Sequence, residues 1–116
     1  MSRTPATPER AALHQFIARH ERFLLTTHLN PDGDAIGSEV GFAHLLRVLG
    51  KQVRVLNDSA TPHAFTWLGL EAPVEVYTEA LAEACFAEAD ALVVLDTGNK
   101  QRIGHVANHI DRHAIA

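Results

Sequence analysis

The sequence predicts an α/β fold with three layers, in which a mostly parallel sheet is flanked by helices on both faces. Short apolar runs, rich in β-branched residues, alternate along the chain with longer runs whose apolar residues recur at helical spacing. Hydrophobic residues make up 47% of the 116 residues and charged residues 21%, as in average soluble globular domains. The length suits one domain, because chains divide into several domains only above about 250 residues.

The first half of the chain predicts two helices and two strands. Residues 7–9, Thr-Pro-Glu, are typical of a helix start and leave residues 1–7 as a flexible N-terminus. Residues 23–27 form a short apolar run, which predicts a buried strand. Apolar residues then recur at helical spacing over residues 40–49. Over residues 53–58 apolar and polar residues alternate, which indicates a second strand.

The second half continues the alternation. Residues 59–73 are ambiguous and hold the single tryptophan, which suggests a short helix over the core. A short strand over residues 74–77 precedes an Ala- and Glu-rich helix over 78–89. Residues 91–95, Ala-Leu-Val-Val-Leu, are the strongest strand signal of the chain, and a last helix runs through residues 103–110.

Composition excludes several classes of protein. The single cysteine, Cys85, excludes a disulfide framework and is expected to be a small core residue. No apolar run approaches the roughly 20 residues of a membrane helix, and the N-terminus lacks the apolar region of a signal peptide, so we expect a cytoplasmic protein without membrane contact. The net charge of -4 argues against a protein held to nucleic acid by its overall charge.

Metal-ligating side chains follow the first strand and the strongest strand. His28, Asp32 and Asp34 lie in a polar loop over residues 28–38, and Asp96 ends the later strand. Ligands collect beyond the carboxyl ends of parallel strands, so we expect these groups to meet. Mixed imidazole and carboxylate ligands favour manganese or magnesium over structural zinc.

A simple surface turn is the alternative interpretation of the loop, because Asn-Pro-Asp-Gly residues are common in turns. The histidine just beyond a buried strand and the second strand-ending Asp favour a site. The loop does not match the Ca²⁺-loop, Walker A or dinucleotide patterns.

The sequences of the two segments resemble motifs of a known family. Residues 28–38, HLNPDGDAIGS, resemble the first motif of the DHH phosphoesterases, and residues 93–98, VVLDTG, followed by 102–104, RIG, resemble the second. Residues 49–53, LGKQV, resemble the helix-to-strand junction of the family. Within the family, the subgroup of bifunctional oligoribonucleases and phosphoadenosine-phosphate phosphatases is the most similar.

The resemblance implies a catalytic metal centre. His28, Asp32 and Asp34 would be metal ligands, and Asp96 would bridge two ions, with Mn²⁺ expected and Mg²⁺ as the alternative. All four would be catalytic. At the margin of the site, Asn30 and Ser38 are candidates for contacts to the ligands or to phosphate.

The implied reaction is the metal-dependent hydrolysis of short oligoribonucleotides, of 3'-phosphoadenosine 5'-phosphate, or of both, through water activated by two ions. The implied partners are therefore RNA oligonucleotides or nucleotide phosphates, and the complete protein could form a homodimer. Alternatives are a pyrophosphatase or a cyclic-dinucleotide phosphodiesterase of the same superfamily, or a non-catalytic module that binds a nucleotide or a protein.

The sequence also departs from the family, because the Asp-His-His motif that names it is absent. Residues 111–113, Asp-Arg-His, precede the strand on which that motif would lie. Residues 8–116 are therefore expected to be the N-terminal portion of a DHH domain, without the C-terminal substrate-binding domain. Since four protein ligands are few for two ions, we expect this portion alone to bind metal weakly and to turn over little substrate.

A stripe of three histidines is predicted on the last helix at positions 105, 109 and 113. The plain interpretation is a solvated stripe near a helix C-terminus, where positive charge is tolerated. The alternative is a face that binds a transition metal.

Overall fold

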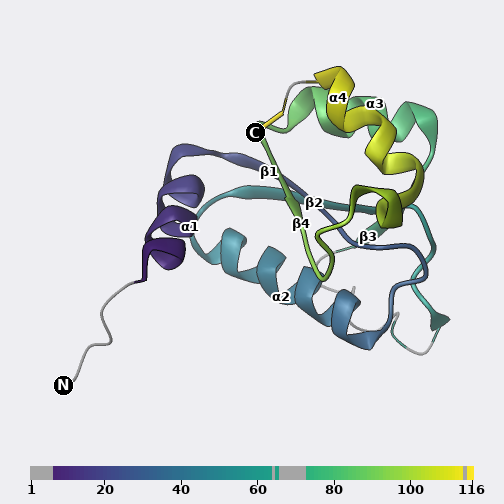
Figure 1. Ribbon diagram of the computed structural model, residues 1–116, viewed down its shortest axis with the longest axis horizontal. Helices are drawn as coiled ribbons and strands as arrows, with labels where there is room; N and C mark the ends of the chain where they lie inside the picture. The colour runs from purple at the N-terminus through teal and green to yellow at the C-terminus, as the bar shows by residue number, and fades with distance from the viewer. Residues whose placement is uncertain (1–6, 64, 66–72, 114) are drawn as a thin grey trace.

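All described strands of the computed structural model belong to one parallel sheet (Figure 1). The structure describes residues 7–63, 65, 73–113 and 115–116. The strand order is β3-β2-β1-β4. The strands are β1 (Arg22–Thr26), β2 (Gln52–Asn57), β3 (Val74–Val76) and β4 (Ala91–Val94). The parallel α/β architecture predicted from the alternating pattern is confirmed.

Helices precede, separate and follow the strands. They are α1 (Pro8–Arg19), α2 (Gly33–Val48), α3 (Glu79–Glu88), the 3₁₀ helix η2 (Lys100–His109) and α4 (Ile110–His113). Helix α2 lies between β1 and β2, and α3 lies between β3 and β4. The hydroxyl of Thr7 caps α1 as predicted, by accepting a hydrogen bond from the backbone N–H of Arg10 at 3.2 Å. Residues 1–6 and most of the ambiguous segment 59–73, with its tryptophan, lie outside the described residues.

The sheet separates two hydrophobic cores, because alternate side chains of a strand point to opposite faces. Phe23 and Leu25 of β1 join the cluster with α1 and α2, whereas Leu24 joins the cluster with α3 and η2. Figure 1 shows α2 below the sheet and α3 with α4 above it. The three-layer arrangement is therefore present.

Strand register brings the two chemically distinctive segments together. β1 lies beside β4, and Thr26 pairs with Val94 near the carboxyl ends of both strands. His28 and Asp96 each follow two residues after these paired positions. The sheet therefore places both side chains beyond the carboxyl ends of β1 and β4, as the sequence predicts.

The last helix differs from the prediction of a regular helix. Gly104 interrupts it with φ 82° and ψ −145°, and 3₁₀ turns precede the short α4. The expected solvated histidine stripe is wrong for His109, whose side chain is 0% exposed, while that of His105 is 71% exposed. Burial of His109 is tolerated because both ring nitrogens have polar partners, Glu83 and Tyr77.

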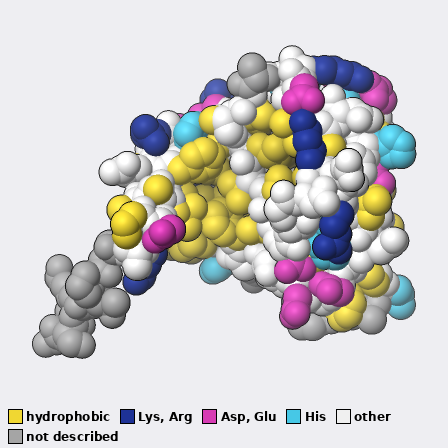
Figure 2. Space-filling view, in the orientation of Figure 1, with side chains coloured by type: hydrophobic (Ala, Val, Ile, Leu, Met, Phe, Trp, Pro, Cys, Tyr) yellow, Lys and Arg dark blue, Asp and Glu magenta, His cyan; other side chains and the backbone are white. Residues whose placement is uncertain are grey.

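Strand β4 lies at an edge of the sheet. Its Leu92 N–H donates to the carbonyl of Ala116 at 2.8 Å on the side away from β1. Figure 2 shows hydrophobic side chains gathered in a hollow between α1 and the C-terminal helices. Leu92, Val94 and Ile110 help to line a cavity of about 360 Å³ beside β4. No helix within the described residues combines the length and apolar character needed to cross a membrane.

Candidate metal centre

His28 is held in one tautomer just beyond β1. Its Nδ1 lies 2.7 Å from the carbonyl oxygen of Leu29, and because a carbonyl only accepts, Nδ1 carries the proton. In the neutral ring the other nitrogen, Nε2, carries the lone pair, and it lies 3.2 Å from Oδ2 of Asp96. His28 is only 7% exposed, so its ring has little freedom to turn. Metal-ligating histidines are commonly fixed in this way by a hydrogen bond from the second nitrogen.

Backbone strain marks both sides of the site. Asn30 has φ 50° and Asp96 has φ 62°, and these are the only non-glycine residues with positive φ in the described ranges. Such conformations are uncommon for residues with a side chain and cluster at functional sites. The Asn30 N–H donates to the hydroxyl of Ser59 at 3.1 Å, which helps to hold that turn.

Asp32 caps α2 and reaches the site from the helix N-terminus. One of its carboxylate oxygens, Oδ1, accepts a hydrogen bond from the Ala35 N–H at 2.9 Å, which leaves Oδ2 free of that bond. The capping bond also explains why α2 begins at Gly33, inside the predicted loop. A Cβ at Gly33 would lie 3.1 Å from the ring of Phe65, so the close approach of the two segments favours glycine.

The structure brings together three of the four predicted ligands. One ligand atom each from His28, Asp32 and Asp96 lies within 4.8 Å of the others. Asp34 is exposed in the first turn of α2 and is not in this group. Residues two positions apart on a helix do not share a face, which explains why Asp32 and Asp34 separate. Ser38 is exposed one turn further along α2.

A buried polar chain behind the site was not predicted. Glu39 of α2 is 0% exposed, and its Oε1 accepts a hydrogen bond from Asn57 Nδ2 at 2.8 Å. Asn57 Oδ1 in turn accepts from the Thr27 N–H at 3.2 Å, one residue before His28. Burial raises the pKa of Glu39 to about 7, against the lowering effects of the Asn57 hydrogen bond and of His28.

One sequence signal could have revealed this carboxyl group. Glu39 occupies the helical stripe that otherwise consists of Ile36, Ala43 and Leu46, all of which are buried. A charged residue within an apolar stripe requires a buried partner. Asn57, at the carboxyl end of β2, supplies it.

The donor set fits a divalent ion that prefers oxygen and imidazole ligands. The 3.2 Å between His28 Nε2 and Asp96 Oδ2 is close to the spacing of about 3 Å between neighbouring ligands of an octahedral ion bound at about 2.1 Å. Asp32 and Asp96 are exposed, so their negative charges face solvent and attract cations.

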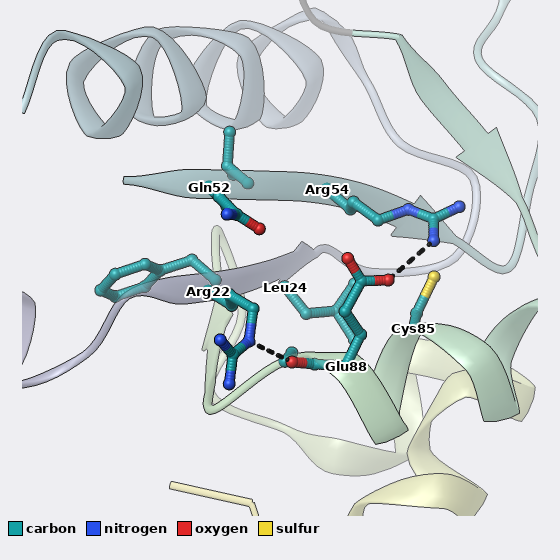
Figure 3. A pocket seen from close by; sticks show the side chains of 9 residues that line it. Arg22, Leu24, Gln52, Arg54, Cys85 and Glu88 are labelled. Atoms are coloured by element: carbon teal, nitrogen blue, oxygen red, sulfur yellow. Dashed lines mark hydrogen bonds and ion pairs between the residues drawn. The ribbon is translucent and has the colours of Figure 1, made fainter. Parts of the chain in front are cut away.

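A small cavity at the opposite end of the sheet is unrelated to this centre (Figure 3). It lies at the amino ends of β1 and β2, where Arg22 Nε donates to the carbonyl of Glu88 at 2.7 Å. Its volume of about 20 Å³ has room for roughly one water molecule. Burial raises the pKa of the Cys85 thiol at its wall, and this residue is a small core residue, as predicted.

Comparison with known proteins finds similarity over most of this chain. A probable manganese-dependent inorganic pyrophosphatase of Enterococcus faecalis is 38% identical over 105 residues, which cover 82% of this chain and 32% of that protein. The bifunctional oligoribonuclease and PAP phosphatase NrnA of Thermus thermophilus is 34% identical over 95 residues, covering 77% of this chain and 27% of that protein. NrnA of Mycoplasma pneumoniae is 30% identical, covering 75% of this chain and 26% of that protein.

A solved structure supports the same relationship. The exopolyphosphatase-related protein of Bacteroides fragilis superposes with a TM-score of 0.86 at 25% identity, covering 99% of this chain and 34% of that one. No family model matches the chain. The chain spans about a quarter to a third of the length of these relatives.

Proposed function

Because this chain belongs to the DHH phosphoesterase family, we propose that it supplies the metal centre of a manganese-dependent phosphoesterase. The proposed substrates are short oligoribonucleotides and 3'-phosphoadenosine 5'-phosphate. The convergence of His28, Asp32 and Asp96 beyond the carboxyl ends of β1 and β4 carries the proposal. Two relatives named as oligoribonuclease and PAP phosphatase support this substrate class.

Each residue has a role that its environment supports. His28 offers the Nε2 lone pair, because its Nδ1–H donates to Leu29. Asp32 offers the oxygen that does not cap α2, and Asp96 offers an exposed carboxylate that can contact two ions. Asp34, exposed in the first turn of α2, would offer a carboxylate oxygen to a second ion.

Two Mn²⁺ ions, when bound, would lower the pKa of a shared water and neutralise charge on the phosphoryl oxygens. The chain itself orients these ligands at the carboxyl ends of β1 and β4, and the Nδ1 contact to Leu29 holds the His28 ring with Nε2 facing Asp96. Asn30 and Ser38, both exposed at the margin of the site, are proposed to contact the ligands or the substrate phosphate. Residues 8–116 are proposed to be one portion of the catalytic domain, with weak metal binding and slow turnover on their own.

A pyrophosphatase is the second candidate, because a relative with 38% identity is named as a probable manganese-dependent inorganic pyrophosphatase. The same ligand set could serve both reactions, because each needs an activated water and neutralised phosphoryl oxygens. They differ in the group that carries the phosphate, a nucleoside in one case and a second phosphate in the other.

Calorimetric titration with Mn²⁺ tests the metal centre. We expect His28→Ala and Asp96→Ala each to weaken binding at least tenfold, because each removes one converging ligand. His14→Ala, which removes an exposed histidine of α1 away from the site, is the matched control and should bind as the parent does. Unchanged binding in both site variants would show that the ions bind elsewhere.

A comparison of product release from different substrates tests the substrate class. With the chain loaded with Mn²⁺ and in excess over substrate, release of phosphate from 3'-phosphoadenosine 5'-phosphate and of mononucleotides from a short RNA should exceed release from pyrophosphate. The Asp96→Asn variant, which loses a proposed metal ligand, is the inactive control and serves as the blank. Faster release from pyrophosphate would favour the second candidate, and strong metal binding with no difference from the blank would favour a non-catalytic module.

A further inference from the structure

A second group of metal-ligating side chains lies away from the centre described above. Glu83 of α3 faces His109 at the end of η2 and His113 of α4. Its Oε1 lies 2.8 Å from His109 Nδ1, and its Oε2 lies 3.1 Å from His113 Nε2. One ligand atom from each of the three residues lies within 4.8 Å of the others. Helical segments on one face of the sheet therefore present an imidazole–imidazole–carboxylate set to a common point.

The hydrogen bonds around His109 define where its proton lies. The Tyr77 hydroxyl donates its single proton to Glu79 Oε2 at 2.7 Å, so its oxygen is left to accept. His109 Nε2 lies 3.0 Å from that oxygen and is therefore the protonated nitrogen. Nδ1 then directs its lone pair at the carboxylate of Glu83.

Two lone pairs do not meet at 2.8 Å unless a cation lies between them. The position between His109 Nδ1 and Glu83 Oε1 therefore holds either a second proton on the ring or a metal ion. The ring of His109 is 0% exposed and packs against Phe86 with centroids 5.6 Å apart. A metal ion would bind the Nδ1 lone pair, and the Nε2–H bond to Tyr77 is the outer contact that metal-bound histidines usually make.

Arg112 is the competing cation. Its Nη1 lies 3.0 Å from Glu83 Oε1 and 3.1 Å from Glu79 Oε1. Because Glu79 also holds the guanidinium, Arg112 can remain in place when Glu83 turns toward an ion. The stacked rings of His109 and His113, with centroids 6.3 Å apart, already lie one helical turn from each other.

We propose that Glu83, His109 and His113 form a second metal site, which binds a zinc-class transition-metal ion and joins α3 to α4. Two imidazoles and one carboxylate, with a fourth position open to water, are a common ligand set for zinc. The first centre has one imidazole and several carboxylates, which favours Mn²⁺ or Mg²⁺. The two sites should therefore differ in metal preference.

The test uses a chain whose first centre has been disabled by His28→Ala and Asp96→Ala. Titration of this chain with Zn²⁺ should show one equivalent bound, and Co²⁺ should give the intense visible absorption of a four-coordinate ion. Adding Glu83→Gln or His113→Ala should weaken binding at least tenfold and abolish the Co²⁺ bands. His105→Ala, on the same helix but exposed, and His14→Ala are matched controls that should retain both signals.

His113 and Glu83 are partly exposed, so their variants are expected to fold, which circular dichroism checks. If the disabled chain does not fold, the same variants are made in the parent chain and the Co²⁺ bands are recorded with the first centre saturated with Mn²⁺. Absence of a bound equivalent of Zn²⁺, or binding that survives both Glu83→Gln and His113→Ala, would overturn the proposal. In that case a ring proton occupies the position between Glu83 and His109.

Discussion

Glu39→Gln is the substitution that most directly tests the buried carboxyl group behind the metal centre. Glutamine has the shape of the protonated acid, and its Oε1 can still accept the hydrogen bond from Asn57 Nδ2. The other oxygen of Glu39, Oε2, is buried and has no hydrogen-bond partner among the described residues. The substitution therefore removes the ionisation while keeping the contacts.

The magnitude follows from the pKa of Glu39, which burial raises from 4.5 to about 7. In the interval between these values the folded chain binds more protons than the unfolded chain, so the free energy of unfolding falls as pH rises. A shift of about 2.5 pKa units corresponds to about 3 kcal/mol. This stability is present below pH 4.5, is lost by about pH 7, and stays lost above it.

Urea unfolding between pH 4.5 and pH 8, in the presence of a chelator, measures the effect. The difference in stability between Glu39→Gln and the parent should grow from near zero at the acid end to about 3 kcal/mol in favour of the variant at pH 8. Glu9→Gln, at an exposed position of α1, is the matched control and should follow the parent. Parallel curves for Glu39→Gln and the parent would refute the burial of an ionisable carboxyl group.

Two further predictions concern backbone positions outside the site. Gly104→Ala should lower stability by more than about 2 kcal/mol in urea unfolding, because φ is 82° and the new Cβ would lie 2.6 Å from Asp58 Cγ. Gly41→Ala in α2 should instead raise stability by about 0.5–1 kcal/mol, because nothing lies within 4 Å of the new Cβ. Equal effects of the two glycine substitutions would contradict this difference. Asp90→Ala should cost about 1–2 kcal/mol, since the carboxylate accepts from the N–H groups of Glu21 and Arg22, while Asp90→Asn, which keeps an acceptor, should cost less. A larger loss in Asp90→Asn than in Asp90→Ala would show that the backbone contacts do not matter.

The part of the site that could be predicted from the sequence depends on sheet geometry. The carboxyl ends of parallel strands lie on the same side of the sheet. A histidine after one apolar run and an aspartate after another therefore meet when the two strands are neighbours. His28 and Asp96 meet for this reason. The separation of Asp34 from the group was missed, because the start of α2 at Gly33 depends on the capping bond of Asp32.

The buried polar contacts depended on tertiary neighbours that periodicity does not reveal. Glu39 occurs in an apolar stripe, but its partner Asn57 is 18 residues away at the end of another strand. His109 was expected in a solvated stripe with His105, and the break at Gly104 together with the packing against Phe86 separates their environments. Both cases require knowledge of which elements pack together.

Anomalous diffraction from a crystal of the chain soaked with Mn²⁺ is the most direct test of the proposed metal centre. The proposal predicts a manganese peak within about 2–2.5 Å of His28 Nε2 and of the Asp96 carboxylate, at the carboxyl ends of β1 and β4. A manganese peak confined to other side chains, with none near His28 Nε2 and Asp96, would contradict it.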